Sequence, residues 1–215
     1  MTDEVLGELT LATALLAIAG FVDAVGFLTL GHLFVSFASG NSTEFAIGVG
    51  GVSLSKTAAA GGLVGLFVVG VVGGRILAIA AKDWRRPAIL VVEAALLGAA
   101  ALVPLSGARP AILMALAMGA QNGVLHKAGP TKTALTYVTG TLVNFGERLA
   151  DALCRAGPAG AWVPYLALWI GIVCGGAAGA AAYGAWGIRA LLVPVACVLL
   201  LAATTGAIEW RKQRG

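Results

Sequence analysis

Charge is what this sequence has least of. Only 11% of its 215 residues are Asp, Glu, Lys or Arg, whereas soluble domains carry about 25%. The three cysteines form no CxxC pair, and residues 1–4 are acidic where a secretory signal would be basic. These absences exclude a soluble enzyme, a secreted disulfide scaffold and a nucleic-acid-binding module. We also expect the first apolar segment to be retained as a helix.

Apolar residues are abundant instead. They make up 59% of the chain, and the mean hydropathy is +0.93. The 31 glycines lie within runs of Ala, Val and Leu, a composition typical of membrane helices whose backbones pack closely. The sequence therefore predicts an all-α polytopic protein of the lipid bilayer. Its net charge of +4 is interpreted as a record of membrane orientation rather than as a sign of an acidic partner.

Eight apolar segments of nearly membrane-spanning length follow one another along the chain. They are 8–30, 33–51, 57–80, 87–105, 110–129, 133–149, 161–187 and 190–208. The second and sixth differ from the rest because each carries a glycine between hydroxyl or amide residues, in Ser39-Gly40-Asn41 and Thr139-Gly140-Thr141. We expect these two to be broken or re-entrant segments, since glycine permits a turn. The alternative is a complete, tilted helix with tight glycine packing.

An internal repeat relates the two unusual segments. A shift of 100 residues places 32–41 on 132–141, and the apolar segments repeat at the same offset. The third and seventh segments, at matching places, both carry glycines four residues apart, a spacing that lets helices approach closely. The chain is therefore predicted to consist of two membrane repeats, 1–106 and 107–215, within one integrated domain.

Basic residues in the loops test how the segments cross. If all eight span, the two sides hold seven and six basic residues, which gives no bias. If the second and sixth segments return to the side from which they start, the counts become ten and three. The ten are Lys82, Arg85, Arg86, Lys127, Lys132, Arg148, Arg155, Arg211, Lys212 and Arg214. Because positive loops stay inside, this favours cytoplasmic termini, six full transmembrane helices and two inverted repeats.

Four motifs support a family resemblance. They are GFVDA at 20–24, FVSFASGN at 34–41, GAQNG at 119–123 and YVTGT at 137–141. Together they resemble the YoaK-like family of bacterial inner-membrane proteins, over nearly the whole chain. The resemblance implies a small multi-pass protein of the inner membrane and supplies no substrate. In relatives the first motif is similar to Thr-Gly-Asn, and Ser39 stands here in place of the threonine, which keeps a hydroxyl.

Asp23 is the foremost candidate site residue, because an ionisable group inside a membrane costs roughly 2.5–3.5 kcal/mol and needs a reason. It lies about 10 Å from the outer boundary at 1.5 Å per residue. It could bind a proton or cation, or it could accept backbone N–H bonds from the broken segment. Gln121 and Asn122 are its counterparts in the second half. Glu44 follows Asn41 by three residues and either faces the same cavity or reaches the outer surface.

Other polar residues receive structural interpretations. Arg75 and Glu93 have similar depth on either side of a short loop and are predicted to form an ion pair across a helical hairpin. The three cysteines are expected to be small core residues. His32 and His126 lack metal-ligand spacing, and no nucleophile or nucleotide-binding motif appears. We therefore expect no catalytic residue, no metal and no cofactor.

These observations favour a secondary transporter or channel for a small solute or ion, with proton coupling through Asp23. The solute would bind between the two polar breaks. The predicted site comprises Asp23, Ser39, Gly40, Asn41, Glu44, Gln121, Asn122, Thr139, Gly140 and Thr141. The alternative is a non-transporting structural or regulatory protein that packs against a partner. A homodimer is compatible with either, because faces of small residues often pack against a second copy.

Overall fold

The computed structural model describes residues 3–51, 53–103, 108–125 and 138–214. Within these ranges the regular structure is entirely helical. The elements are α1 (Asp3–Thr29), α2 (Ala38–Val49), α3 (Leu54–Ala81), η1 (Lys82–Trp84), α4 (Arg85–Leu102), α5 (Arg109–Gln121), α6 (Val138–Leu153), α7 (Val163–Trp186), η2 (Gly187–Leu191) and α8 (Leu192–Lys212). An all-helical chain is what an apolar solvent demands, because each helix satisfies its own backbone hydrogen bonds.

Three helical stretches of the described chain are long and apolar enough to cross a membrane. They are Val5–Thr29, Lys56–Leu102, which contains α3 and α4, and Val163–Lys212, which contains α7 and α8. The helices α2, α5 and α6 are shorter, with 12, 13 and 16 described residues. At 1.5 Å per residue these extend about 18, 20 and 24 Å, less than the roughly 30 Å of a hydrocarbon core. Residues 126–137, between α5 and α6, lie outside the described structure.

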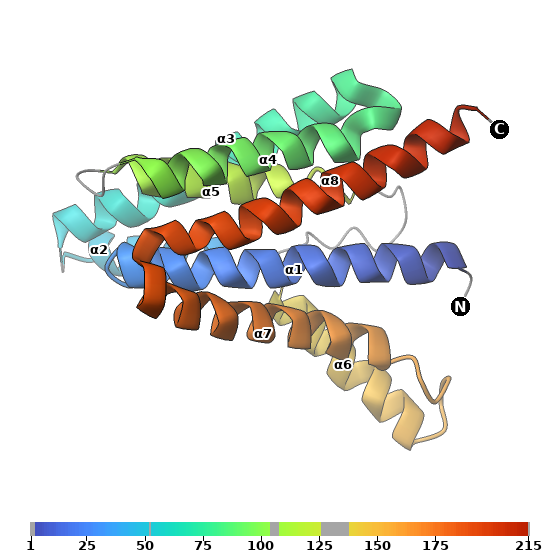
Figure 1. The fold of residues 1–215 in the computed structure, drawn as a ribbon. Helices are drawn as coiled ribbons and strands as arrows, with labels where there is room; N and C mark the ends of the chain where they lie inside the picture. The colour runs from blue at the N-terminus through green and yellow to red at the C-terminus, as the bar shows by residue number, and fades with distance from the viewer. Residues whose placement is uncertain (1–2, 52, 104–107, 126–137, 215) are drawn as a thin grey trace.

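The helix directions show how the short helices fit. Both chain termini lie at one end of the molecule, together with η1 and the connection from α6 to α7 (Figure 1). The helices α1, α4 and α7 run away from that end, and α3, α5 and α8 run toward it (Figure 1). α1 ends where α3 begins, so α2 and its flanking loops start and finish at the same end. The helices α1, α3 and α4 thus run opposite to α5, α7 and α8, respectively (Figure 1).

Glycines bring the helix backbones together at two interfaces. On α3, a methyl group added to Gly74 would lie 2.6 Å from the carbonyl oxygen of Ala120 on α5. On α7, one added to Gly179 would lie 2.5 Å from the carbonyl oxygen of Phe21 on α1. Gly70 on α3 and Gly175 on α7 are similarly closed by backbone atoms of α5 and α1. Most of the glycines in the predicted spacing therefore pack within the chain, whereas a methyl group added to Gly65 would meet nothing within 4 Å.

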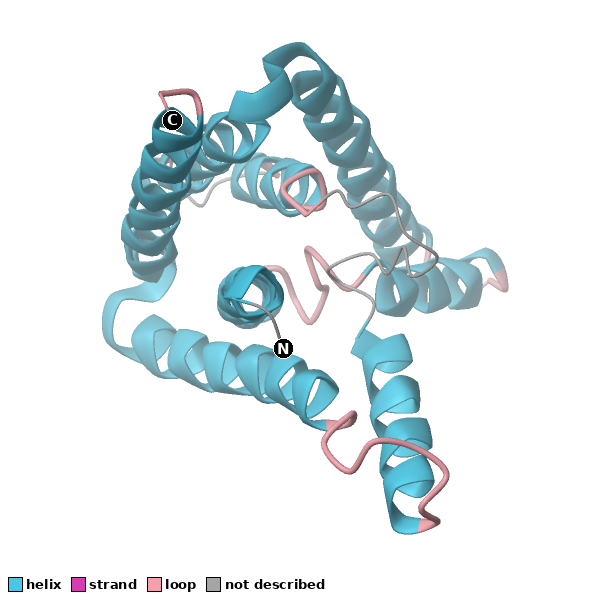
Figure 2. Ribbon diagram, turned by 90° about the vertical axis from the view of Figure 1, so that its right-hand side faces the viewer, coloured by secondary structure: helices cyan, strands magenta, loops and turns pink. Residues whose placement is uncertain are grey.

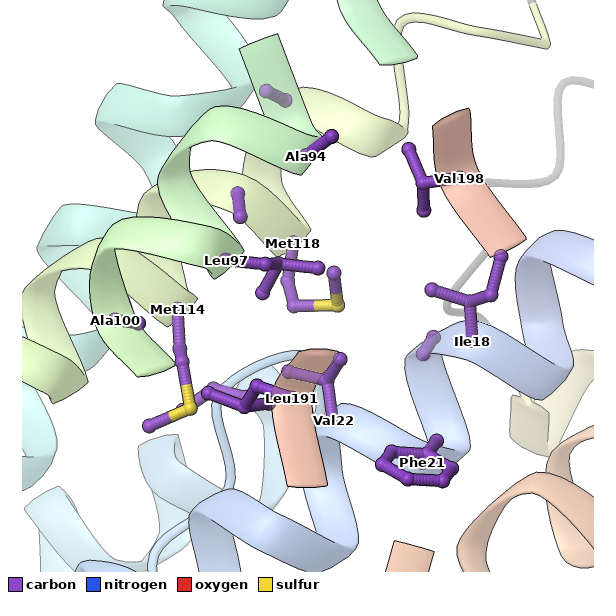
Figure 3. Packing of buried hydrophobic residues seen from close by; sticks show 14 of the residues in the cluster. Ile18, Phe21, Val22, Ala94, Leu97, Ala100, Met114, Met118, Leu191 and Val198 are labelled. Atoms are coloured by element: carbon purple, nitrogen blue, oxygen red, sulfur yellow. The ribbon is translucent and has the colours of Figure 1, made fainter. Parts of the chain in front are cut away.

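The core lies around α1. Figure 2, which looks from the end that holds both termini, shows α1 enclosed by other helices. Its buried side chains join those of α4, α5, η2 and α8 in one cluster, including Val22, Leu97, Met118 and Leu191 (Figure 3). The faces of α3 and α8 that point away from this core expose large apolar residues, among them Val69, Ile76 and Leu200. An apolar surface of this extent suits contact with lipid.

Several expectations need correction. The chain leaves helical structure at residues 30–37, so Ser39-Gly40-Asn41 lies in the first turn of α2 rather than at the break. Thr139-Gly140-Thr141 lies in the first described turn of α6, and because residues 126–137 lie outside the described structure, a break in the sixth segment stays a prediction. The backbone turns at Gly31 and His32, which both have positive φ. Because a turn at Gly31 does the work assigned to Gly40, the second segment is a shorter helix than predicted.

The cysteine interpretation is also wrong. All three cysteines are exposed on the described structure rather than buried. Because a free cysteine behaves as a small apolar residue, its exposure on a membrane protein is consistent with contact with lipid. The start of the predicted 133–149 segment, the end of the 110–129 segment and His126 lie outside the described residues.

Candidate functional site at the first helix break

Asp23 holds the non-helical segment that connects α1 to α2. Its Oδ1 accepts hydrogen bonds from the backbone N–H groups of Val35 at 2.8 Å and Ser36 at 2.7 Å. The Ser36 hydroxyl donates to Oδ2. Asp23 and Ser36 are both buried. Backbone outside a helix survives at membrane depth only where protein satisfies it, and this carboxyl supplies three acceptor contacts.

The Asn41 side chain, on α2, binds the same segment from its C-terminal side. Its side-chain Oδ1 accepts from the N–H of Phe34 at 3.1 Å, and its Nδ2 donates to the carbonyl of Phe34 at 2.5 Å. The amide thus pairs with both backbone groups of one residue, as a neighbouring strand would. Together, Asp23 and Asn41 bind the N–H groups of three consecutive residues, 34–36, and the carbonyl of Phe34. The break is therefore a built feature, fixed by side chains of the helices on both sides.

Aromatic rings pack around this segment. Phe27 of α1 contacts the rings of His32 and Phe34, with centroid separations of 4.8 and 4.9 Å. Phe34 in turn lies edge to face against Phe37, at 5.4 Å. A methyl group on Gly40 would lie 2.8 Å from the Phe37 ring. Glycine is needed at position 40 to make room for this ring, not to turn the chain.

A cavity of about 580 Å³, broadly open to the surface of the protein, lies beside the break. Phe37, immediately before α2, and Val138, the first residue of α6, both line it. Asp23 contributes the one carboxyl group of the lining, and the remaining residues are mostly apolar and come from α1 and α7. The cavity therefore brings together the N-terminal ends of the two short helices. At the start of α2, the N–H of Ala38 donates to the carbonyl of Ser36, and those of Gly40 and Asn41 donate to the carbonyl of Phe37.

The other predicted residues fall into two groups around the short helices. Ser39, Glu44 and Thr139 are exposed, whereas Gly140 and Thr141 are buried. Glu44 is exposed and does not line the cavity beside Asp23. On α6, the Nδ2 of Asn144 donates to the carbonyl of Gly140 at 2.8 Å. Asn144 was not predicted, although it lies 100 residues after Glu44 and the repeat could have indicated it.

Gln121 and Asn122 lie elsewhere, at the end of α5. Gln121 is fully buried, and its Nε2 donates to the carbonyl of Leu15 on α1 at 3.0 Å. The Nδ2 of Asn122 donates back to the carbonyl of Met118 at 3.1 Å. The side-chain oxygens of both residues are buried and have no hydrogen-bond partner in the described part of the chain. Neither residue lines the cavity beside Asp23.

Two further buried residues were not among the predicted site residues. Ser36 is part of the Asp23 contact, and its alignment with Thr136 in the repeat was the available signal. Glu93 is wholly buried and lacks a hydrogen-bond partner among the described residues, whereas Arg75 is exposed. The predicted ion pair between Arg75 and Glu93 is therefore wrong, because the two side chains face different surroundings.

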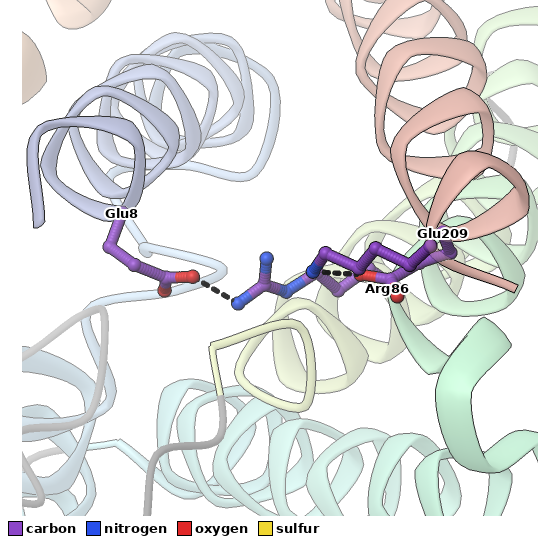
Figure 4. Close-up of polar contacts among 4 residues, drawn as sticks. Glu8, Arg86 and Glu209 are labelled. Atoms are coloured by element: carbon purple, nitrogen blue, oxygen red, sulfur yellow. Dashed lines mark hydrogen bonds and ion pairs between the residues drawn. The ribbon is translucent and has the colours of Figure 1, made fainter. Parts of the chain in front are cut away.

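A second cavity, of about 930 Å³, lies at the end that holds both termini. It is bordered by α1, by residues 83–86 and by α8. Glu8 of α1 and Arg86 of α4 form an ion pair at this cavity, and Glu209 of α8 pairs with Lys212 (Figure 4). These charged residues lie near the ends of their helices. From the sequence alone, charges at such positions indicate the orientation of the protein in the membrane and do not identify ion pairs.

Apolar helices, lipid-facing surface and a helix break stabilised by buried polar groups define a polytopic membrane protein. The chain belongs to the family described as "Protein of unknown function (DUF1275)", which matches residues 11–204. The resemblance to YoaK-like proteins is thereby confirmed.

Two relatives cover most of the chain. This chain is 34% identical to the UPF0700 transmembrane protein RA0705 of Rhizobium meliloti (strain 1021), over 95% of this chain and 89% of the relative. It is 30% identical to the UPF0700 transmembrane protein YoaK of Bacillus subtilis (strain 168), over 67% of this chain and 68% of the relative. No solved structure matches this chain.

Proposed function

We propose that this protein is a secondary transporter or channel for a small solute or ion in the bacterial inner membrane. The observation that carries the proposal is the cavity shared by the starts of α2 and α6. Short helices that begin at membrane depth and point their N-termini at one cavity are a recurring construction of solute sites. Neither Ser39-Gly40-Asn41 nor Thr139-Gly140-Thr141 lines the cavity, and the Asn41 amide is engaged by Phe34. Solute contact in these first turns would therefore fall to the exposed hydroxyls of Ser39 and Thr139.

The packing pattern supports an inverted repeat with six full transmembrane helices. Under the repeat, α1 to α4 correspond to α5 to α8. The contact between α1 and α7 then corresponds to that between α5 and α3, and the contact between α2 and α3 to that between α6 and α7. All four contacts occur, and α4 packs on α8 as the symmetry requires. The opposite directions of corresponding helices agree with the same arrangement (Figure 1).

Two cavities along one helix support alternating access. Residues 7–14 of α1 border the cavity at the termini end, and residues 20–28 border the cavity beside Asp23. Between them α1 is packed, with Leu15, Leu16, Ile18 and Ala19 all buried. At 1.5 Å per residue this packed layer is about 9 Å thick. Such a layer would separate an outward site from a cytoplasmic vestibule, and a shift of one repeat against the other would connect them.

Asp23 has a positioning role in this proposal. Its oxygens are engaged by the segment at 34–36, so it fixes the geometry at the start of α2. Solute contact falls to the first turns of α2 and α6.

Water access to the cavity tests the proposal. Ala24 lines the cavity, whereas Ala100 is fully buried in the core. In a background with the three native cysteines replaced by alanine, we expect an impermeant thiol reagent to label Ala24→Cys in intact cells and to spare Ala100→Cys. Protection of both positions in cells and in inverted vesicles would mean a dry interior and would contradict transport.

Membrane topology provides an independent test. With re-entrant second and sixth segments, residue 56 lies outside and residue 85 lies in the cytoplasm. We therefore expect labelling of Lys56→Cys and protection of Arg85→Cys in intact cells, with cytoplasmic termini. The reverse pattern would mean eight complete crossings and would remove the shared cavity from membrane depth.

The alternative is a structural or regulatory protein that acts by packing against a partner. Its strongest basis was the glycine spacing of α3 and α7. In the described structure Gly70 and Gly74 pack on α5, and Gly175 and Gly179 pack on α1. These surfaces are occupied within the chain, which favours transport over the partner hypothesis.

A further inference from the structure

Glu93 is a buried acid without a visible partner. It lies in α4 with no exposed surface, and neither carboxyl oxygen has a hydrogen-bond partner among the described residues. It follows Arg85, the first residue of the helix, by eight positions, which places it about 12 Å along the axis. An ionised carboxylate without a partner in such surroundings is very costly, and the usual outcome is neutralisation.

The register of α4 against α5 shows what Glu93 faces. The two helices pack against each other and run in opposite directions (Figure 1). Leu97 and Met118 meet in the core (Figure 3), and a methyl group on Gly123 would lie 2.9 Å from Ile89 Cδ1. Glu93 lies between these two contact levels, four residues from each of its α4 neighbours. It therefore faces the C-terminal end of α5.

That end of α5 carries two amide oxygens that lack donors. Asn122 follows Met118 by four residues and so lies on the same face of the helix. Its Oδ1 and the Oε1 of Gln121 are buried and have no partner in the described part of the chain. The nitrogen of each amide is already used, by Met118 and Leu15 respectively. Glu93, Gln121 and Asn122 thus present buried acceptors, and the group missing from all of them is a donor.

No cation in the described structure supplies that donor. The charged groups of the elements packed around α4 are engaged elsewhere or face outward. Arg75, Arg109 and Arg189 are exposed, one terminal nitrogen of Arg86 pairs with Glu8, and Glu209 pairs with Lys212. The buried Nε of Arg86 has no hydrogen-bond partner among the described residues, but Arg86 lies seven residues before Glu93, about 10 Å along α4. A proton on Glu93 is the smallest addition that satisfies the cluster, because a neutral carboxyl donates one hydrogen bond and still accepts others.

We propose that Glu93 is the proton-binding site of this protein and that its O–H donates to the side-chain oxygen of Asn122, with Gln121 as the adjoining acceptor. Binding forms only the O–H bond on one carboxyl oxygen, and release returns that proton to water. Gln121 holds Leu15, which lies in the packed layer between the two cavities, so the site adjoins the layer that must open during transport. This coupling role rests on the proposed transport function, whereas the protonated state of Glu93 does not.

Infrared spectroscopy of the unmodified protein and its variants, in lipid vesicles at neutral pH, tests directly whether Glu93 carries a proton. A protonated carboxyl has a carbonyl band distinct from that of a carboxylate. We expect one such band in the unmodified protein, its complete loss in Glu93→Gln, and its retention in Asp23→Asn. The glutamine resembles the neutral acid in shape, so this variant should fold, and its elution by size exclusion checks that it does. A protein without this band, or a band that survives in Glu93→Gln, would overturn the proposal.

A second variant and a salt series identify the acceptor and the ion. Asn122→Leu removes the amide oxygen and should shift the Glu93 band to higher wavenumber, because the carboxyl loses its acceptor. An unchanged band would contradict the assigned hydrogen bond. Replacing potassium with sodium should leave the band unaltered, and its loss in sodium would mean a metal-cation site and not a proton site. Since these measurements need no transport, failed transport with an intact band would reject only the proposed function.

Discussion

Asp23 and Glu93 are two buried carboxyl groups in one membrane core, and their surroundings are opposite. Asp23 receives three hydrogen bonds, two from backbone N–H groups and one from a hydroxyl. Glu93 receives none in the described part of the chain. Asp23 sits where a helix breaks and free N–H groups need an acceptor. Glu93 sits on a continuous helix, whose N–H groups are already used.

The difference shows that burial alone does not define a functional acid. A carboxyl surrounded by donors is part of the scaffold, because removing it exposes several backbone groups to an apolar environment. A carboxyl without donors contributes little to folding, and its retention needs another reason. Stability measurements can therefore separate the two roles. The variants below form a series in which the expected loss of stability falls from the Asp23 segment to Glu93.

Asp23→Ala should be the most destabilising change. It leaves the N–H groups of Val35 and Ser36 and the Ser36 hydroxyl without their acceptor, and we expect the free energy of unfolding to fall by about 3–5 kcal/mol. Thermal unfolding in detergent, followed by size exclusion, measures the change as a lower melting temperature. Asp23→Asn is the matched control, because its oxygen can still accept from the backbone, and it should lose less than half as much. Equal losses would show that charge, and not hydrogen bonding, is what position 23 provides.

Asn41→Ala should have the second largest effect. The substitution frees both the N–H and the carbonyl of Phe34, and the expected loss is about 2–3 kcal/mol. Asn144→Ala offers a comparison on α6, because Asn144 bonds only within its own helix. The same melting assay should show a clearly smaller shift for that variant. A shift as large as that of Asn41→Ala would mean that a lost asparagine side chain, wherever it bonds, accounts for the effect.

Ser36→Ala removes a single contact, the hydroxyl that donates to Asp23. The expected loss is about 1–2 kcal/mol, which for a chain of this size lowers the melting temperature by roughly 2–8 °C. Ser42 is exposed, and its hydroxyl bonds within α2, so Ser42→Ala should leave the melting temperature nearly unchanged. In a double variant with Asp23→Ala, the Ser36 effect should shrink because its partner is gone. Full additivity would argue against the Asp23 contact.

Much of the fold could be predicted from the sequence. Apolar runs located α1, α3, α4, α7 and α8 within a few residues, since exposure to lipid requires such runs whatever their partners. The start of α2 could not be placed in this way. The segment 30–37 is held by Asp23, which lies 12 and 13 residues before the groups it binds. No local pattern of glycine and hydroxyl residues reports a contact of that kind.

Only part of the candidate site could be predicted, because the contacts of a buried acid are not visible in the local sequence. Asp23 is predicted as a site residue because an acid inside a membrane costs free energy. That cost is the same whether the residue stabilises the fold or binds a solute. Glu93 was assigned to Arg75 because both have similar depth along their helices. Depth does not determine which face a residue occupies, and the structure places Glu93 inside and Arg75 outside.

Glu93→Leu should have the smallest effect of the series. Because no partner of Glu93 is lost, replacing this acid with an apolar side chain should change the free energy of unfolding by less than about 1 kcal/mol, and could raise it. Glu44 is exposed, so Glu44→Leu serves as the control for exchanging an acid for leucine in the same melting assay. A loss as large as that of Asp23→Ala would mean that Glu93 supports the fold, and the contrast between the two acids would disappear. A stable Glu93→Leu protein would instead leave proton binding as the reason for an acid at this position.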